Sequence, residues 1–532
     1  MKKLYLFIIA LFLLNINYAQ KNKKITSAGG ISIAEAFLVK DIVSVKEHGF
    51  LVFQSYTLNE ELELEFQIYD LTRTLTNRTT FRYDESKGEP YVHGYTEWND
   101  HFLLFVSYFN ESINKNELYY YQYTLPSLEL INSGKIMEAY SPLDLNIPFF
   151  YSTSDDESKL AIASWSYSIP KDPAKMDIRV FNKDFKIIKE YSHLLPYDNM
   201  KLYVKESIVD NDGNAYLIGK RHVGNTTASY NQLGTLKGDP FILAFYTDQQ
   251  DPNLYEIDVK KFRFPIIEFS LNPQQELVGI GFYRNGGKKT FSGVCSFTVS
   301  PKDKSLKLNT SEINKDLLIN ALGDKPPAYK NASLFRYASI KDLILKDKAY
   351  YLVGENLRVN VEQQSINPYQ YSTVFGYNYD PIGNAQRYTS EYALLDMFVI
   401  KLNKQGTIVW MKRIPKEQKV DIEKYDYLSF SVLERERDIL LFYNDHPDNL
   451  SFKPKDKVKK TEIRTAQPML AKIHCSSGKV TKRKLTSLFG KNSVIRPDLC
   501  KMIDEEKVFM YGQKKKWDLK TYRMKVARLG GS

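Results

Sequence analysis

Cysteine is scarce in this chain of 532 residues, which contains Cys295, Cys475 and Cys500 and no others. An exported domain that relies on disulfides usually carries a larger, even set, so the count argues against a disulfide scaffold. Because a buried cysteine behaves as a small hydrophobic residue, we expect three buried free thiols. No cysteine is paired with a histidine at metal-ligand spacing, so the sequence predicts no metal site.

Long apolar runs are also rare. One lies at the N-terminus, from Leu4 to Leu14, after Lys2 and Lys3 and before Ala19. It is shorter than the ~20 residues of a membrane-spanning helix, and its flanks are typical of a secretory signal. No later stretch approaches that length. We therefore expect residues 1–19 to be a signal peptide, no transmembrane segment, and export to the periplasm or cell surface.

Local signatures of catalysis are absent from the sequence. The seven histidines are scattered and form no HExxH motif, and there is no GxSxG elbow, phosphate-binding loop or Cys-x-x-Cys pair. Acid and base groups from distant segments can still meet in a folded protein, so these absences do not decide whether it is an enzyme. They favour a non-catalytic protein without a cofactor.

Aromatic residues are abundant, with 38 Tyr and 30 Phe, and they occur in a repeated pattern. A short apolar run, entered through a polar turn of the kind that forms tight hairpins, recurs eight times. The runs are FLVFQSY from Phe50, FLLFVSY from Phe102, LAIASWS from Leu160, AYLIGKR from Ala215, LVGIGFY from Leu277, YYLVGEN from Tyr350, ILLFYND from Ile439 and VFMYGQK from Val508.

Each run is followed by a second predicted hairpin, so each unit has four short strands. Eight such units predict an all-β fold, a single eight-bladed β-propeller over residues 20–532, with seven blades as the alternative. The last unit ends at Leu529 after its third strand, and Ile31–Val39 is a spare strand near the N-terminus. We expect this strand to complete the last blade and close the ring.

The positions of the insertions predict a functional face. If the strands of a blade are labelled a to d from the axis outward, the a–b and c–d turns share one face, and the b–c and d–a connections share the other. The turns are short, and loops on a rigid scaffold often carry function. The insertions are the b–c connections Arg221–Pro240, Asn285–Thr290, Leu357–Leu394, His446–Gln467 and Gln513–Lys520, and the d–a connection Ser311–Lys330, with a short helix around Leu317–Leu322.

The sixth unit contains FVIKLNKQGTIVWMKRIP, in which Gly406 follows a turn and Trp410 lies four residues later. This segment resembles the repeat of quinoprotein-type propellers. In the dehydrogenases of that family, tryptophans dock the blades, and a pyrroloquinoline quinone lies near the axis with calcium and a base. This chain has no adjacent-cysteine pair and no matching acidic and Asn set. The resemblance therefore implies the non-catalytic scaffold members, such as the propeller lipoprotein of the outer-membrane assembly machinery.

Basic and tyrosine-rich loops supply the candidate binding residues. The basic loops could bind an acidic partner or could be solvated segments of a lysine-rich protein. The tyrosines of the longest insertion could stack on sugar rings, pack against a protein, or fold back over the axis as a plug. The predicted binding residues are Lys288, Lys289, Lys453, Lys455, Lys459, Lys460, Lys515, Tyr369, Tyr371, Tyr377 and Tyr379.

The formal charge of +11 permits an acidic partner but does not require one. These features favour a non-catalytic bacterial propeller that binds an envelope protein or an acidic glycan, and not a nucleic acid. It would act as a scaffold or accessory subunit of a cell-envelope assembly, with peripheral association to an outer-membrane complex as one possibility. The alternative is a carbohydrate-active enzyme or lectin that acts on a glycan, which two convergent carboxylates in a cleft would favour.

Overall fold

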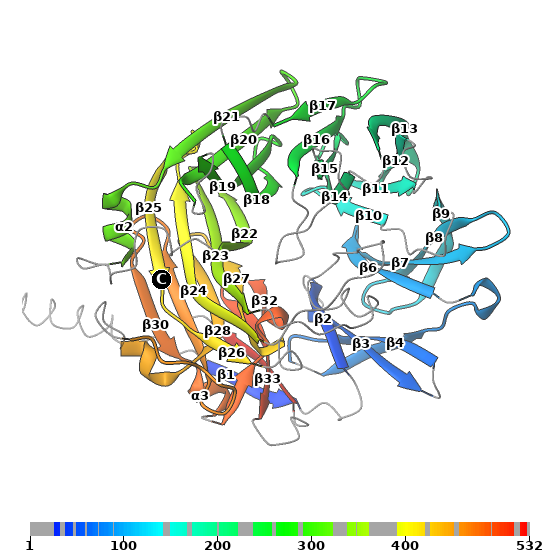
Figure 1. Cartoon of the computed structure of the whole chain (residues 1–532). Helices are drawn as coiled ribbons and strands as arrows, with labels where there is room; N and C mark the ends of the chain where they lie inside the picture. The colour runs from blue at the N-terminus through cyan, green and yellow to red at the C-terminus, as the bar shows by residue number, and fades with distance from the viewer. Residues whose placement is uncertain are drawn as a thin grey trace, which may run out of the picture.

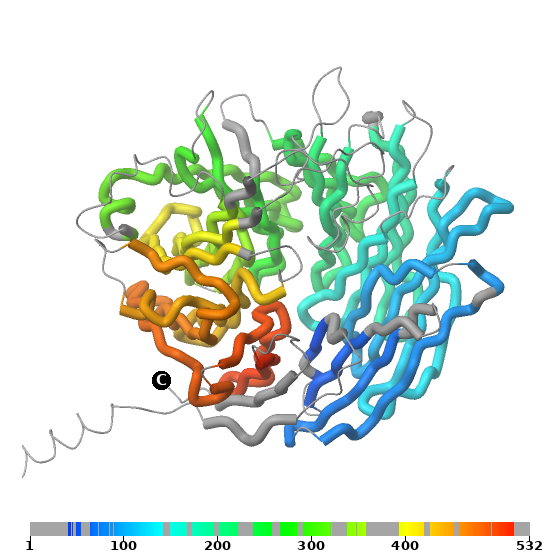
Figure 2. The backbone as a smooth tube through the Cα atoms, turned by 60° about the horizontal axis from the view of Figure 1, so that its bottom comes forward, coloured from blue at the N-terminus to red at the C-terminus, as the bar shows by residue number. Residues whose placement is uncertain are grey.

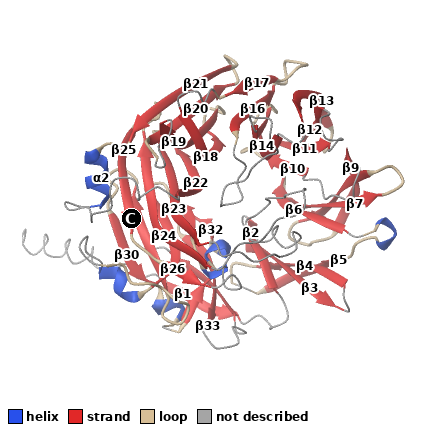
Figure 3. Ribbon diagram, viewed as in Figure 1, coloured by secondary structure: helices blue, strands red, loops and turns tan. Residues whose placement is uncertain are grey.

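Eight antiparallel sheets surround a common axis and form an eight-bladed β-propeller, which confirms the predicted fold (Figure 1, Figure 3). The structure is a computed structural model. It describes residues 26–31, 38–45, 49–58, 61–72, 74–88, 90–141, 149–166, 173–198, 202–221, 238–257, 262–285, 291–322, 338–346, 348–360, 391–420, 426–451, 457–490, 492–514 and 522–528.

Each of the first four blades is a four-stranded sheet whose strands follow in chain order from the axis outward (Figure 1). Blade 1 contains β2 (Leu38–Val45), β3 (Gly49–Leu58), β4 (Glu61–Tyr69) and β5 (Leu75–Phe81); blade 2 contains β6 (Pro90–Trp98), β7 (His101–Asn110), β8 (Lys115–Thr124) and β9 (Leu130–Tyr140); blade 3 contains β10 (Phe149–Thr153), β11 (Lys159–Ser166), β12 (Pro173–Asn182) and β13 (Ile187–Asp198); blade 4 contains β14 (Leu202–Val209), β15 (Ala215–Arg221), β16 (Asp239–Phe245) and β17 (Asn253–Glu256).

The next blades follow the same plan, except that blade 6 has an extra short strand and the inner strand of blade 8 is divided. Blade 5 contains β18 (Phe262–Leu271), β19 (Leu277–Asn285), β20 (Gly293–Ser300) and β21 (Ser305–Glu312); blade 6 contains β22 (Ala338–Lys346), β23 (Ala349–Asn360), β24 (Glu391–Leu402), β25 (Ile408–Ile414) and β26 (Gln418–Val420); blade 7 contains β27 (Phe430–Glu434), β28 (Asp438–Asp445), β29 (Gln467–His474) and β30 (Val480–Lys484); blade 8 contains β31 (Ser493–Ile495), β32 (Lys501–Asp504), β33 (Lys507–Lys514) and β34 (Tyr522–Arg528).

Helices are few and short in the described residues. The α-helices are α2 (Lys315–Leu322) and α3 (Thr486–Phe489), and the 3-10 turns are η2 (Glu85–Lys87), η6 (Pro447–Ser451) and η7 (Pro497–Leu499). Helix α2 lies in the predicted d–a connection between blades 5 and 6, where its Leu318 packs against both blades. In the described part of the chain, no helix is long and apolar enough to cross a membrane.

The eight apolar runs are the second strands of the blades because these strands are buried on both faces. In β28, Ile439 and Leu441 pack against blade 6, whereas Leu440 and Phe442 pack against blade 8. Every pair of neighbouring blades shares such a cluster, including blades 8 and 1 through Phe50 and Phe509. At about 1.5–3 kcal/mol for each large apolar side chain, this burial is the main cohesive force between blades.

The ring is closed by an N-terminal strand, as predicted, but the strand lies earlier in the chain. Strand β1 (Thr26–Ile31) pairs with β34 as the outermost strand of blade 8, with Thr26 opposite Arg528. The expected segment, Ile31–Val39, is divided: Ile31 ends β1, and Val39 belongs to β2 of blade 1. The boundary was wrong because an edge strand needs only backbone pairing, so the small residues of TSAGGI gave no apolar signal.

All three cysteines are free and buried, which confirms the expectation from the sequence. Cys295 lies in β20, and burial raises its pKa. Burial also raises the pKa of Cys500 to about 12, so its thiol stays protonated at neutral pH. These thiols are therefore packing groups.

Hairpin glycines bring blades 6 and 7 close to the blades that precede them. Gly406, in the turn between β24 and β25, has a φ of 78°, and a Cβ added there would lie 1.9 Å from the Oγ of Ser296 in blade 5. Gly478 of blade 7 makes a similar approach to Trp410 of blade 6, where an added Cβ would be 3.0 Å from the indole ring. Trp410 thus packs between blades 6 and 7.

Replacing Gly406 by alanine tests this close approach. Gly88 is the control, since its φ of 89° is also positive but an added Cβ would meet nothing within 4 Å. Gly406→Ala is expected to lower the free energy of unfolding by about 1–3 kcal/mol more than Gly88→Ala does, because only the first creates a clash between blades. Urea unfolding measures both; equal losses would mean that backbone strain alone accounts for the effect.

Candidate binding surface

The strands that flank the insertions end and begin on one face of the ring, as predicted, and we call it the loop face. Strand β15 ends at Arg221 and β16 begins at Asp239, and the b–c connections of blades 5 to 8 occupy the equivalent place between their second and third strands. Because neighbouring strands are antiparallel, all b–c and d–a connections emerge on this face. The opposite face, which we call the turn face, carries only the short a–b and c–d turns. Figure 2 shows the blades from a second direction.

Two of the predicted binding residues can be placed in detail. Lys459 and Lys460 lie in the b–c connection of blade 7, and both are exposed. The other predicted residues lie outside the described residues, although the connections that carry them all leave from the loop face. They are Lys288, Lys289, Lys453, Lys455, Lys515, Tyr369, Tyr371, Tyr377 and Tyr379.

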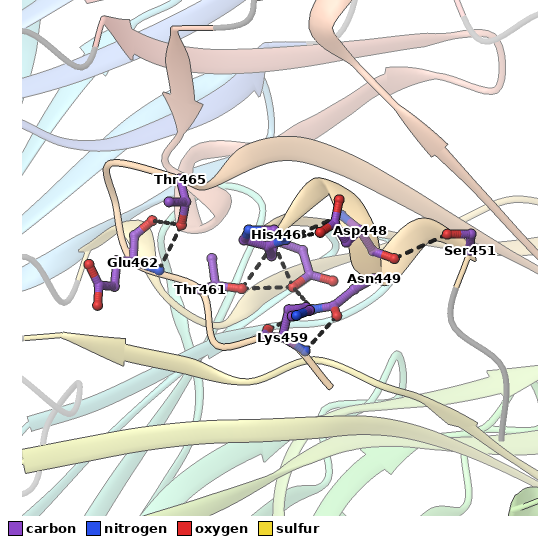
Figure 4. Close-up of polar contacts among 9 residues, drawn as sticks. His446, Asp448, Asn449, Ser451, Lys459, Thr461, Glu462 and Thr465 are labelled. Atoms are coloured by element: carbon purple, nitrogen blue, oxygen red, sulfur yellow. Dashed lines mark hydrogen bonds and ion pairs between the residues drawn. The ribbon is translucent and has the colours of Figure 1, made fainter. Parts of the chain in front are cut away.

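A buried carboxylate anchors the blade 7 connection at both of its ends (Figure 4). Oδ1 of Asp445 accepts hydrogen bonds of 2.8 Å from the backbone N–H of His446, from Nδ2 of Asn449 and from Oγ1 of Thr461. Asp445 is only 1% exposed, and its burial raises the pKa of its carboxyl group. The sequence gave no sign of this anchor, because residues 445 and 461 meet only after folding.

Asn449 then fixes the main chain of Lys459 (Figure 4). The side chain of Lys459 remains exposed. The Lys459 N–H donates to Oδ1 of Asn449 at 2.8 Å, and Nδ2 of Asn449 donates to the Lys459 carbonyl at 2.9 Å. The Nζ of Lys482, in strand β30, donates to the Asn449 carbonyl at 2.7 Å. The described residues of this connection, 446–451 and 457–466, therefore form an ordered platform beneath Lys457, Lys459 and Lys460.

The same connection is joined to blade 6. The Thr461 N–H donates to the Glu417 carbonyl at 2.7 Å, and the Lys419 N–H donates to the Thr461 carbonyl at 3.4 Å. A short parallel bridge thus pairs Gln418 with Thr461. Strand β26 in turn pairs with Tyr392–Leu394 of β24, so the junction ties the blade 7 connection to the sheet of blade 6.

A buried ion pair supports the junction from below. Nζ of Lys416 is 2.6 Å from Oε2 of Glu355, and the two side chains are 0% and 6% exposed. Lys416 also donates to Oε1 of Gln418 at 2.7 Å, and Nε2 of Gln418 donates to the carbonyl of Asn444 at 2.7 Å. Removing one partner of such a pair leaves an uncompensated buried charge, so the network holds these strands in one arrangement.

Asn444 extends this network to the last blade. Its Nδ2 donates to the Ile495 carbonyl at 2.7 Å, and its Oδ1 accepts from the Ile495 N–H at 3.0 Å. Ile495 belongs to β31, the inner strand of blade 8. Polar contacts therefore connect blades 6, 7 and 8 directly under the loop face.

The surface above this network is basic. Lys457, Lys459 and Lys460 are exposed, and within the described residues no carboxylate lies within ion-pair distance of their amines. Two acidic residues flank these lysines in the chain: Asp456, which lies outside the described residues, and Glu462, which is 3.6 Å from Arg464 and so is partly neutralised. This arrangement of exposed amines suits an acidic ligand.

A second feature of the loop face was not predicted from the sequence. A groove of about 640 Å³ lies between blades 2 and 3, near the starts of β8 and β12. Tyr140 and Leu194 line it and are 38% and 62% exposed. Its walls carry ion pairs within each blade, such as Arg179 with Glu190 at 2.6 Å. In the sequence, this groove is marked only by apolar residues on outer strands. The sequence alone does not show which apolar residues stay exposed, so the groove was not predicted.

In the part of the chain that the structure describes, no three His, Cys, Asp or Glu residues converge as metal ligands. The buried His93 has its pKa lowered to about 3 by burial, and its Nε2 is 2.8 Å from Oγ of Ser107. It is therefore a neutral core histidine.

Comparison with known proteins identifies no family. No family model matches the chain, and no curated protein was found as a relative. Among solved structures, the chain is similar to the β-propeller domain of the Trilobed protease from Pyrococcus furiosus, with 12% identity, a TM-score of 0.35, and coverage of 86% of this chain and 98% of that one. The WD40 domain of SCAP from fission yeast gives 8% identity, a TM-score of 0.38, and coverage of 96% and 95%.

A polysaccharide lyase, Uly1, is also similar, with 12% identity, a TM-score of 0.34, and coverage of 86% of this chain and 93% of that one. These neighbours have different activities, and similarity at this level carries no argument about function. The propeller follows from the eight sheets of the chain itself.

The Asp445 anchor gives a testable prediction. Asp445→Ala should leave the donors of His446, Asn449 and Thr461 without their acceptor, at a cost of about 1–3 kcal/mol. Amide hydrogen exchange at residues 446–451 and 457–461 should accelerate roughly tenfold or more, while β28 stays protected. Asp448→Ala is the control, because that side chain is 66% exposed on the same connection. Equal exchange in the two variants would refute the anchor.

Proposed function

We propose that the protein is an exported, non-catalytic propeller that binds an acidic envelope protein or acidic glycan through the loop face. It would serve as a scaffold or accessory subunit of a bacterial cell-envelope assembly, as the N-terminal signal and the quinoprotein resemblance suggest. The observation that carries the proposal is the ordered platform of blade 7, on which Lys457, Lys459 and Lys460 extend into solvent. A lysine whose main chain is already ordered loses less entropy when it binds than one in a free loop.

The proposal has a second candidate, a carbohydrate-active enzyme or lectin. The groove between blades 2 and 3 supports it, because about 640 Å³ is within the usual range for a ligand site. If the protein is a lectin, the groove would hold one sugar unit, and the basic platform would contact a charged part of the same glycan.

Charge reversal on the platform tests the proposal. The wild-type protein and the variant Lys459→Glu/Lys460→Glu would be crosslinked mildly in the native host envelope and purified by a tag. The amount of stoichiometric partner recovered with the variant should be at least tenfold lower than with the wild type. The reason is that the acidic side chains of the variant would face the acidic surface of the partner. The attraction should also weaken in the wild type as salt is raised.

The matched control reverses Lys302 and Lys348, which are exposed on turns of the opposite face. Lys302→Glu/Lys348→Glu has the same net charge as the platform variant and should keep the partner. Equal loss in the two variants would show that net charge, rather than the platform, drives association. No loss in the platform variant would overturn the proposal.

A further inference from the structure

The groove between blades 2 and 3 has two walls that come from different blades. Near the axis, these blades pack together through an apolar cluster that includes Leu103 and Leu160 of their second strands. The groove lies farther out, between β9, the outermost strand of blade 2, and the outer hairpin of blade 3, β12 and β13 (Figure 1). All the side chains that line it belong to the described residues, so both walls are defined.

The outer edge of β9 is already bonded to blade 3. Nη1 of Arg179 donates to the Ile136 carbonyl at 2.5 Å, and the Tyr140 N–H donates to Oγ of Ser166 at 3.3 Å. A peptide that joins a sheet as an extra strand needs such edge groups for its own hydrogen bonds. The groove therefore does not favour a peptide strand as its ligand.

The charged side chains of the groove neutralise one another. Each charged side chain that lines it in the described structure has a partner of opposite sign, and the partners belong to the same blade. The pairs are Lys115 with Glu138, Lys175 with Asp177 at 3.1 Å, and Arg179 with Glu190 at 2.6 Å. A ligand with a strong charge of either sign would compete with these partners, so the groove does not favour one.

The same ion pairs leave hydrogen-bonding capacity for a neutral ligand. An ion pair occupies only some of the donors of an ammonium or guanidinium group, and only some of the lone pairs of a carboxylate. A hydroxyl group both donates and accepts, so it can bond to either member of a pair without separating the two charges. A ligand with many hydroxyl groups and no charge thus suits these walls.

Apolar side chains supply the other property of a sugar site. Tyr140 projects from β9 and Leu194 from β13, and both are exposed in the groove. A sugar ring carries hydroxyl groups around its rim and C–H groups on its faces, and those faces can pack against an aromatic or aliphatic side chain. The volume of about 640 Å³ is within the usual range for a small ligand.

We propose that this groove binds a neutral oligosaccharide. Tyr140 and Leu194 pack on the faces of its sugar rings, and the paired side chains of both walls bond to its hydroxyl groups. The inference rests on the second candidate function above and makes it more specific, since it names an uncharged glycan as the ligand. It uses none of the platform lysines, so the groove and the platform can be tested separately.

Saturation-transfer difference NMR on the whole protein tests the proposal with four neutral probes: cellotetraose, maltotetraose, mannotetraose and N-acetylchitotetraose. At least one should give a saturable signal, strongest at ring C–H protons, because those protons face Tyr140 and Leu194. Anionic tetragalacturonate and cationic tetraglucosamine should bind about tenfold more weakly than the best neutral probe. No binding of any neutral probe, or tighter binding of a charged one, would overturn the proposal.

Variants of the two apolar side chains locate the site. Tyr140→Ala should weaken binding of the best neutral probe about tenfold, because it removes the stacking surface and keeps the backbone bond to Ser166. Leu194→Ser changes a side chain that is 62% exposed, so it should fold, and it should also weaken binding. Leu130→Ala is the matched control, since Leu130 is an exposed apolar residue of β9 outside the groove. Equal binding by all four proteins would overturn the proposal.

Two further measurements separate this site from the alternatives. The platform variant Lys459→Glu/Lys460→Glu should bind the sugar as the wild type does, whether or not it keeps an acidic partner. Loss of sugar binding in that variant would place the sugar on the platform and overturn the groove assignment. The neutral peptide acetyl-Val-Thr-Val-Thr-amide should bind about tenfold more weakly than the best sugar, because the edge of β9 is occupied. Tighter binding of the peptide would assign the groove to a peptide strand instead.

Discussion

The burial of each blade between its two neighbours is the constraint on which the rest of this protein depends. A second strand such as β28 is apolar on both faces because each face contributes to a different interblade cluster. No blade can bury both faces by itself, so the chain is stable only as a ring. Closure by β1 gives the last sheet its outer strand, and the cluster around Phe50 and Phe509 joins the two ends of the chain.

Because the strands of the ring are committed to packing between blades, binding groups are expected on elements that take no part in that packing. Those elements are the connections of the loop face. The platform of blade 7 shows how ordering is extended outward, from the buried pair of Lys416 and Glu355, through Gln418 and Asn444, to the anchor at Asp445. At its end, three lysines meet solvent from a fixed backbone. We regard this ordered display of charge as the basis of recognition.

The sequence predicted the architecture because apolar runs buried on both faces leave a strong periodic signal. It predicted the loop face for the same reason, since strand order alone decides where connections emerge. The exact closing strand was missed because Thr26–Ile31 contributes backbone pairing rather than an apolar pattern. The run of lysines in the sequence identified Lys459 and Lys460 as candidate binding residues. The platform beneath them was missed, because it depends on side-chain hydrogen bonds between residues 10 and 16 positions apart.

The central claim is that this protein recognises its partner with the loop face. Lysine-reactive crosslinking in the native host envelope, followed by mass spectrometry, would show which of its lysines lie next to another molecule. Our account predicts crosslinks to a partner at Lys457, Lys459 and Lys460, and none at Lys302 and Lys348 on the turn face. Partner crosslinks concentrated on those turn-face lysines, with the platform unreacted, would contradict it.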